Sequence, residues 1–149
     1  MHRNFLYGIE VTGLGGDLRE TVWRNGARAY LGITVPGFPN FFLIFGPNTN
    51  ITSSVVEMME AQCGYILQAL DALASDSNVA LDLREEVMER FDQEMQGNLA
   101  KSAYATGCGS YFRSSNGRVI TNWAGNVRSY RNAIRVFSIA DYTVMVAQS

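Results

Sequence analysis

Residues 40–50, NFFLIFGPNTN, form an apolar run that ends abruptly in a glycine, a proline and two amide side chains. Every position from 41 to 45 is apolar, so a strand at these residues would have no solvated face. The pattern predicts a strand that is covered on both sides, as in a parallel sheet between two other layers. The polar turn at 46–50 then follows the carboxyl end of that strand.

The residues on either side of this run extend the pattern. A β-prone segment at 29–35 precedes it, and the Pro-Gly-Phe-Pro sequence at 36–39 predicts a turn, because proline fixes its own φ and disfavours helix at the residue before it. After it, apolar residues recur at helical spacing over 53–74. Ser54 is the predicted N-cap of this helix, and Glu57 three residues later completes a capping box.

Two further elements are predicted beyond this helix. A short strand is expected at 79–83, and a second amphipathic helix with an acidic first turn at 84–100. From residue 102 onward the chain is rich in Gly, Ser, Asn, aromatic residues and arginine, and a turn at 114–118 is expected to join two short strands. The predicted fold class is α/β, with few strands flanked by two amphipathic helices and an irregular C-terminal arm. Residues 1–101 form the predicted α/β domain, and residues 102–149 form a basic arm packed on it.

Charge is distributed unevenly along the chain. Residues 1–100 contain six Lys or Arg and thirteen Asp or Glu, whereas the remaining residues contain six basic residues and one acidic residue. A basic tail is compatible with an anion site for phosphate or nucleic acid. Because its basic residues are scattered, the favoured interpretation is a solvated surface that docks on the acidic body.

Several classes of site are disfavoured by the residue inventory. Cys63 and Cys108 have no CxxC spacing, which indicates neither a zinc site nor a disulfide framework and fits a reducing, cytoplasmic setting. The only histidine is His2, so neither a Ser-His-Asp triad nor any metal site is expected. The N-terminal apolar stretch is too short for a signal-peptide core, and no run is long enough to span a bilayer. We therefore expect a soluble protein without a membrane partner.

The polar turn at 46–50 is the candidate binding site. Gly46 permits a close backbone approach, and Asn48, Thr49 and Asn50 offer hydrogen-bond donors and acceptors. The helix that follows presents unpaired N–H groups and a partial positive charge. Such a corner suits an electron-rich, partly anionic heterocycle or a phosphate. The alternative is a tight loop that only ends a strand.

A longer motif connects this corner to a known family. The segment ARAYLGITVPGFPNFFLIFGPNTN, followed by EAQCGYILQAL, resembles the C-terminal part of the flavin-dependent monooxygenases of the Baeyer-Villiger and flavin-containing monooxygenase group. The likeness is greatest to the branch around 4-hydroxyacetophenone monooxygenase, and it runs from about residue 17 to the end of the chain. It implies part of an FAD-binding fold of the flavoproteins with two dinucleotide-binding domains.

The resemblance also implies roles for individual residues. The helix start would stabilise negative charge on the reduced flavin, and the tail sequence GSYFRSSNGR resembles a segment near the NADP site, in which relatives often have SWY where this chain has Ser-Tyr-Phe. The link ITSS after the turn is shorter than in relatives. The implied FAD- and NADP-binding residues are Gly46, Pro47, Asn48, Thr49, Asn50, Ser53, Ser54 and Tyr111.

The function implied by the resemblance is that of the C-terminal portion of an NADPH- and FAD-dependent monooxygenase that acts on a small ketone or a heteroatom. GxGxxG motifs are absent, since GLGG at 13–16 has a different spacing and predicts a surface turn. We therefore expect the chain to be inactive alone, marginally folded or dependent on a partner such as the missing N-terminal portion. No nucleic-acid partner is expected. The alternatives are a noncatalytic α/β binding module with a basic anion-binding tail, or a remnant without function.

Overall fold

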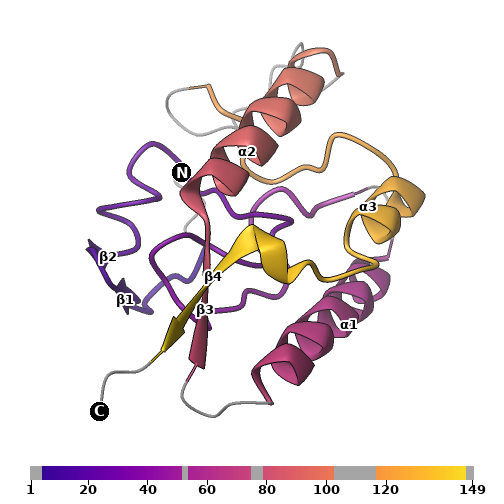
Figure 1. The fold of residues 1–149 in the computed structure, drawn as a ribbon. Coiled ribbons are helices and arrows are strands. Elements are labelled where there is room, and N and C mark those ends of the chain that lie inside the picture. Colours follow the sequence, from indigo (N-terminus) through magenta and orange to yellow (C-terminus); the bar gives the residue numbers. More distant parts are fainter. Residues whose placement is uncertain (1–4, 52–53, 75–78, 103–116, 147–149) are drawn as a thin grey trace.

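The computed structural model describes residues 5–51, 54–74, 79–102 and 117–146. Two long helices, a short helix and two small strand pairs surround a body of packed turns (Figure 1). In chain order the elements are β1 (Thr12–Gly13), β2 (Gly16–Asp17), α1 (Val55–Leu73), β3 (Val79–Leu83), α2 (Glu85–Ala100), α3 (Val127–Ala133), the 3-10 helix η1 (Ile139–Asp141) and β4 (Tyr142–Val146).

The larger strand pair joins the middle of the chain to its end. β3 lies at the predicted residues and pairs antiparallel with β4, with Val79 opposite Val146 and Leu83 opposite Tyr142. The first pair is a tight hairpin, β1–β2, around the glycine-rich turn. The α/β class with few strands beside two amphipathic helices is confirmed. Both strand pairs among the described residues are antiparallel, which differs from the expected parallel sheet.

Both predicted amphipathic helices are present. α1 directs Met58, Gln62, Tyr65 and Ala69 into the protein, in accordance with its helical spacing. On α2, Val87, Met88, Met95 and Leu99 are buried. The acidic first turn of α2, Glu85 and Glu86, agrees with the helix dipole.

The predicted strand at 29–35 is wrong. Leu31 and Gly32 have φ values of 54° and 71°, a left-handed conformation that an extended strand does not contain. The backbone instead turns back on itself, because the amide of Tyr30 donates to the carbonyl of Thr34 at 2.8 Å. This turn is closely packed, and Ile33 is fully buried.

The predicted strand at 41–45 is also wrong. Asn40 and Phe45, at its two ends, have φ values of 55° and 57°. The amide of Leu43 bonds the carbonyl of Ile33 at 2.7 Å, so the middle of the run pairs with a turn. Asn40, at its start, bonds strand β3, where its amide donates to the carbonyl of Leu81 at 3.1 Å. Ile44 is 47 % exposed, so the run is not covered on all sides. Its apolar side chains instead enter several separate clusters.

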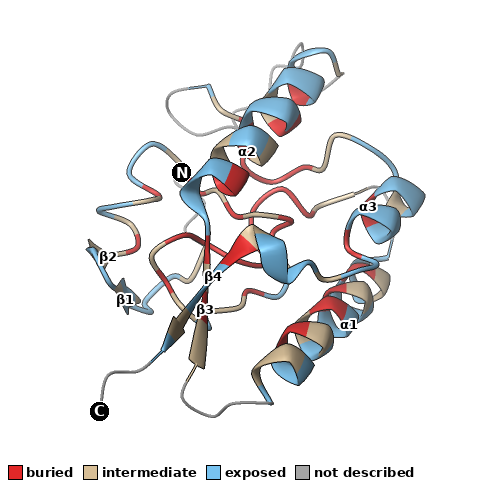
Figure 2. Cartoon of the chain, in the orientation of Figure 1, coloured by how far each residue is buried: buried red, intermediate tan, exposed pale blue. Residues whose placement is uncertain are grey.

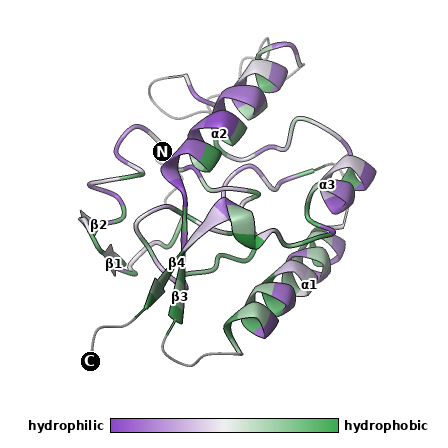
Figure 3. Cartoon of the chain, in the orientation of Figure 1, coloured by the Kyte–Doolittle hydropathy of each residue, from purple (hydrophilic) through white to green (hydrophobic). Residues whose placement is uncertain are grey.

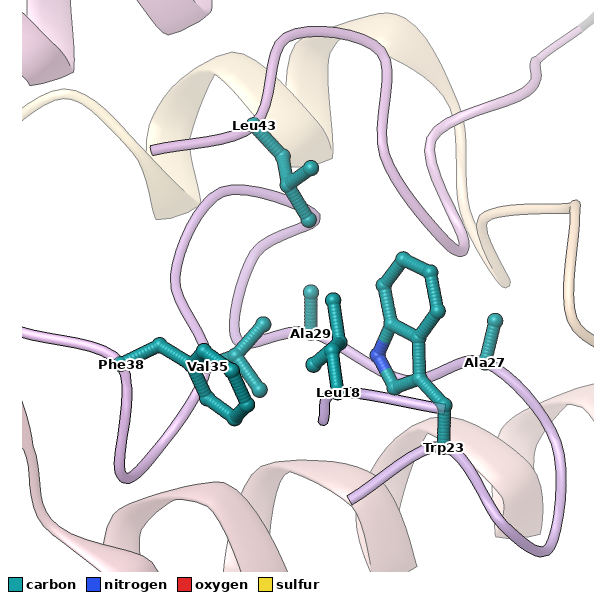
Figure 4. Close-up of a cluster of buried hydrophobic side chains, with 7 residues drawn as sticks. All are labelled: Leu18, Trp23, Ala27, Ala29, Val35, Phe38 and Leu43. Carbon is teal, nitrogen blue, oxygen red and sulfur yellow. The ribbon is translucent and has the colours of Figure 1, made fainter. Parts of the chain in front are cut away.

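The core is divided among clusters that link distant parts of the sequence. Its buried residues lie both in turns and in helices (Figure 2). One cluster is built almost entirely from turn residues, with Trp23, Leu18, Val35 and Leu43 pointing toward one another (Figure 4). A second joins α1 to α3 through Met58, Tyr65 and Tyr130. A third joins α1 and α2 to the β3–β4 pair.

The C-terminal tail packs on the body through apolar and charged contacts. Its elements α3 and β4, which the sequence analysis left unassigned, contribute Tyr130 and Tyr142 to the core. Arg118 pairs with Asp92 of α2, and Arg131 pairs with Glu57 of α1 at 2.9 Å. For these two arginines the favoured interpretation, docking on the acidic body, is confirmed. Within the described part of the chain, no helix is long and apolar enough to cross a membrane.

Candidate functional site

The turn at 46–50 is compact and internally bonded. Phe45 and Asn48 both have left-handed backbone conformations, with φ values of 57° and 58°. The hydroxyl of Thr49 donates to the carbonyl of Gly46 at 2.6 Å and closes the turn. Asn tolerates this conformation well, whereas a phenylalanine there costs about 1 kcal/mol or more. The turn is therefore imposed by its surroundings and does not follow from the preference of each residue.

The amides of this turn bind the tail. Asn48 is buried, and its Nδ2 donates to the carbonyls of Val119 and Asn122 at 3.0 and 2.9 Å. The amide of Asn50 donates to the carbonyl of Thr121 at 2.8 Å, and that of Trp123 donates back to the carbonyl of Asn50 at 3.0 Å. Segments some seventy residues apart therefore lie side by side as a short parallel bridge. Asn48 positions the turn.

Gly46 is required by a second glycine turn. A Cβ at Gly46 would lie 2.3 Å from the carbonyl oxygen of Gly32, and one at Gly32 would lie 2.0 Å from Cγ2 of Thr49. Neither distance leaves room for a side chain. The close approach that the sequence predicted at Gly46 is thus made to the backbone of Gly32, and the two turns interlock.

Gln62 of α1 bonds both the corner and α3, a role that its sequence position did not reveal. Its Oε1 accepts from the amide of Phe45 at 2.8 Å, and its Nε2 donates to the hydroxyl of Tyr130 at 2.8 Å. That hydroxyl donates to the carbonyl of Leu31 at 2.7 Å. Burial raises the pKa of Tyr130 well above its ordinary range, against the opposing effect of the Gln62 hydrogen bond, so the phenol remains a donor. The sequence signal for this role is that Gln62 is an amide side chain on the otherwise apolar face of the predicted helix.

The start of α1 differs from its predicted capping. Ser54 is the N-cap residue, as predicted, but its side chain makes no capping bond. Glu57 pairs with Arg131 of α3 and does not close a capping box. Ser54 is exposed, and its hydroxyl leaves the N–H groups of the first turn without a side-chain cap. The remaining predicted site residues, Ser53 and Tyr111, lie outside the described residues.

A cavity of about 490 Å³ lies elsewhere, against the faces of α2 and α3. Tyr30, Phe91 and Trp123 supply aromatic walls, and Arg90 and Glu94 supply charge. Neither the residues at 46–50 nor Ser54 line it. The structure thus brings Gly46 to Asn50 together at one corner ahead of α1, and this corner touches the cavity wall only indirectly, through the hydrogen bond from the amide of Trp123 to the carbonyl of Asn50. In the part of the chain that the structure describes, no group of three His, Cys, Asp or Glu side chains gathers as a metal site.

Comparison with known proteins connects this arrangement to a family. No family model matches the chain. The chain is 35 % identical over 144 residues to an FAD-binding monooxygenase of Aspergillus niger, a match that covers 93 % of this chain and 24 % of the relative. It is 36 % identical over 131 residues to a Baeyer-Villiger monooxygenase of Pseudomonas aeruginosa, covering 86 % of this chain and 25 % of that protein. This chain is homologous to part of a flavin-dependent monooxygenase of the Baeyer-Villiger group.

Solved structures give the same result for the fold. An oxidised steroid monooxygenase bound to NADP superposes with a TM-score of 0.80 at 25 % identity, over 95 % of this chain and 28 % of that one. A cyclohexanone monooxygenase from Rhodococcus bound to NADP⁺ superposes with a TM-score of 0.78 at 22 % identity, over 93 % and 27 % of the two chains. The resemblance expected from the sequence is confirmed. The chain spans about a quarter of the length of these monooxygenases.

Proposed function

We propose that this chain forms the C-terminal part of an FAD- and NADPH-dependent monooxygenase, with residues 1–101 in the FAD-binding domain and residues 102–149 as an arm packed on it. Its homology to Baeyer-Villiger monooxygenases supports this proposal. In the complete enzyme the substrate is a small ketone or a heteroatom compound. A cytoplasmic setting is part of the proposal, supported by the free, exposed thiol of Cys63.

One observation carries the proposal for the site: the hydrogen-bonded corner at 46–50 precedes α1 in the chain, and the first-turn N–H groups of α1 are not capped by the side chain of Ser54. Such a helix start fits an edge of a ring that gains negative charge. The chain contains no GxGxxG motif, so these residues fit one edge of FAD and not its pyrophosphate. Bound FAD, reduced by NADPH, would supply the redox chemistry with O₂.

The residues of the corner have different roles in this proposal. Asn48 and Thr49 are buried and bonded within the chain, so they hold the turn in place. Gly46 and Pro47 are also buried, and they shape the backbone. Asn50 and Ser54 are less buried, so in this proposal they would contact the flavin edge together with the helix N–H groups. We retain Ser53 and Tyr111 as proposed contacts to FAD and NADP, respectively.

The first test is the visible absorption spectrum of the purified chain with added FAD. We expect the chain alone to retain no flavin, because it lacks a GxGxxG motif to bind the pyrophosphate of FAD. A chimera, in which the chain replaces the matching region of the Pseudomonas monooxygenase, should purify yellow. In that chimera Asn50→Asp adds a negative charge beside the ring and should weaken binding of reduced FAD by about fivefold, equivalent to about 1 kcal/mol.

The distant variant Asn25→Asp is the matched control and should leave flavin affinity unchanged. Equal affinities for Asn50→Asp and Asn25→Asp would remove the corner from the cofactor site. A noncatalytic module that binds an anion through the basic tail is the other candidate. The structure gives it little support, because Arg118 and Arg131 already have acidic partners. Salt-dependent nucleic-acid binding by a colourless chimera would favour it.

A further inference from the structure

The outer face of α1 is apolar where a surface helix is normally polar. We call the outer stripe the five residues Val56, Met59, Cys63, Leu67 and Leu70. Val56 and Leu67 are 62 % and 60 % exposed, Leu70 is 46 % exposed, and Cys63 is an exposed free thiol. The stripe lies on the side of α1 opposite to Met58, Gln62 and Tyr65, which are buried. Helix α1 therefore has two apolar faces, and the described part of the chain covers one of them.

The spacing of the stripe is that of a packing seam. Its residues follow one another at intervals of three, four, four and three, which keeps them on one side of a helix. From Val56 to Leu70 the seam is about 21 Å long at 1.5 Å per residue. Contiguous exposed apolar surface of this kind marks an interaction site.

We propose that the outer stripe of α1 is the surface on which the rest of the flavin monooxygenase packs, in the same chain or as a separate one; this inference rests on the proposed function. Relatives contain about three quarters of their length beyond the matched part, and that part must pack on some face of this fold. The stripe begins at the N-terminal end of α1, where the proposed flavin edge lies. One neighbouring unit can therefore cover both.

Charge favours this occupant over a second copy of the chain. The charged residues of α1 are Glu57, Glu60 and Asp71, all acidic. Glu57 already pairs with Arg131, and Glu60 and Asp71 remain exposed beside the stripe. Two copies meeting through this face would bring negative charges together, which is unfavourable. The face is complementary to an apolar segment flanked by Lys or Arg.

The experiment uses the complete 149-residue chain. It carries Cys108→Ser, so that Cys63 is the only thiol, and is coexpressed with the Pseudomonas monooxygenase from which the matching region has been deleted. Leu67→Lys places a charge in the stripe, and Gln93→Lys makes the same change at an exposed position of α2 as the matched control. The readouts are copurification, the rate of maleimide labelling of Cys63, the oligomeric state and the flavin content.

We expect copurification in equal amounts and at least tenfold slower labelling of Cys63 than in the chain alone. Leu67→Lys should abolish copurification, whereas Gln93→Lys should not. Copurification that survives Leu67→Lys overturns the proposal. So does self-association that protects Cys63 without the partner, which would assign the stripe to a second copy. If the separate parts do not accumulate, the single-chain chimera replaces them. Leu67→Lys should then abolish soluble chimera, whereas Gln93→Lys should not. A chimera that is insoluble without either substitution counts against the proposal.

Flavin content separates this proposal from the proposed function. A colourless complex that depends on Leu67 keeps the docking surface and removes the cofactor role of the corner. A yellow complex that is insensitive to Leu67→Lys keeps the cofactor role and removes the docking surface.

Discussion

The two long helices have similar inner faces and different outer ones. Both α1 and α2 bury methionine and other apolar residues at helical spacing. The exposed side of α2 contains Glu86, Arg90 and Glu94, whereas that of α1 contains the outer stripe. In Figure 3, α2 is mainly hydrophilic, and hydrophobic turns extend along much of α1. The outer face of α2 is therefore charged, whereas the outer face of α1 leaves apolar side chains exposed, and this difference is the basis of the proposed docking surface.

The largest expected effect tests whether the inner faces are equivalent. Met58 of α1 and Met88 of α2 are 1 % and 0 % exposed. Replacing either by alanine should lower the free energy of unfolding by about 2–5 kcal/mol, through lost burial and a residual cavity. Urea denaturation of Met58→Ala and Met88→Ala measures this. A near-zero effect for Met58→Ala alone would mean that α1 is not docked on the isolated chain.

The next effect distinguishes the buried amide of α1 from an exposed amide of α2. Gln62→Leu leaves the amide of Phe45 and the hydroxyl of Tyr130 without their partner, and it should cost about 1–3 kcal/mol. Gln93 is exposed on α2, and Gln93→Leu should change the free energy of unfolding by less than about 0.5 kcal/mol. Equal destabilisation by the two variants, measured in urea, would contradict the bridging role of Gln62.

A smaller effect concerns the acidic start of α2. Arg28 pairs with Glu89 at 2.5 Å and with Glu85 at 3.2 Å. The hydrogen bond from Arg28 lowers the pKa of Glu89 below its ordinary 4.5, so this group contributes stability above pH 4.5 that is lost as the pH falls through its folded value. Burial raises the pKa of Glu85. The stability that this group contributes is therefore present at low pH and is lost as the pH rises through its folded pKa.

The variant Arg28→Met should therefore cost about 0.2–1 kcal/mol at neutral pH, as expected for a partly exposed pair. The difference from the parent chain should shrink as the pH falls through the folded pKa of Glu89, which the Arg28 hydrogen bond holds below 4.5. Thermal unfolding at several pH values measures it. A difference that stays constant down to the pH of acid unfolding would show that Arg28 acts through packing alone.

The smallest expected effect on stability sharpens the contrast between the outer faces. In the isolated chain, Leu67→Lys and Gln93→Lys should each change the free energy of unfolding by less than about 0.5 kcal/mol, because both positions are exposed. Neither variant should change the oligomeric state of the isolated chain, measured by light scattering, because the acidic residues beside the stripe disfavour pairing of two copies. A large loss of stability with Leu67→Lys would show that the stripe is already covered within this chain.

Periodicity alone located the regular elements near the middle of the chain. The helices at 55–73 and 85–100 and the strand at 79–83 follow from spacing, because a helix or strand with one buried face repeats its apolar residues at 3.6 or 2 positions. The apolar run at 41–45 has no such repeat, and burial alone does not require a strand. Its left-handed ends are held by elements distant in sequence: the amide of Asn40 donates to the carbonyl of Leu81 in β3, and the amide of Phe45 donates to Oε1 of Gln62 in α1.

The sequence by itself determined the resemblance to flavin-dependent monooxygenases, the two amphipathic helices and the polar corner at 46–50, since these depend on a local motif and local periodicity. Only the tertiary structure decided what the residues of the corner do. The side chain of Asn48 bonds the carbonyls of Val119 and Asn122 in the tail. Gly46 packs against the carbonyl of Gly32, and Gln62 bonds Phe45 and Tyr130. These partners are distant in sequence, and a buried polar group is satisfied by whichever donor or acceptor the fold brings to it.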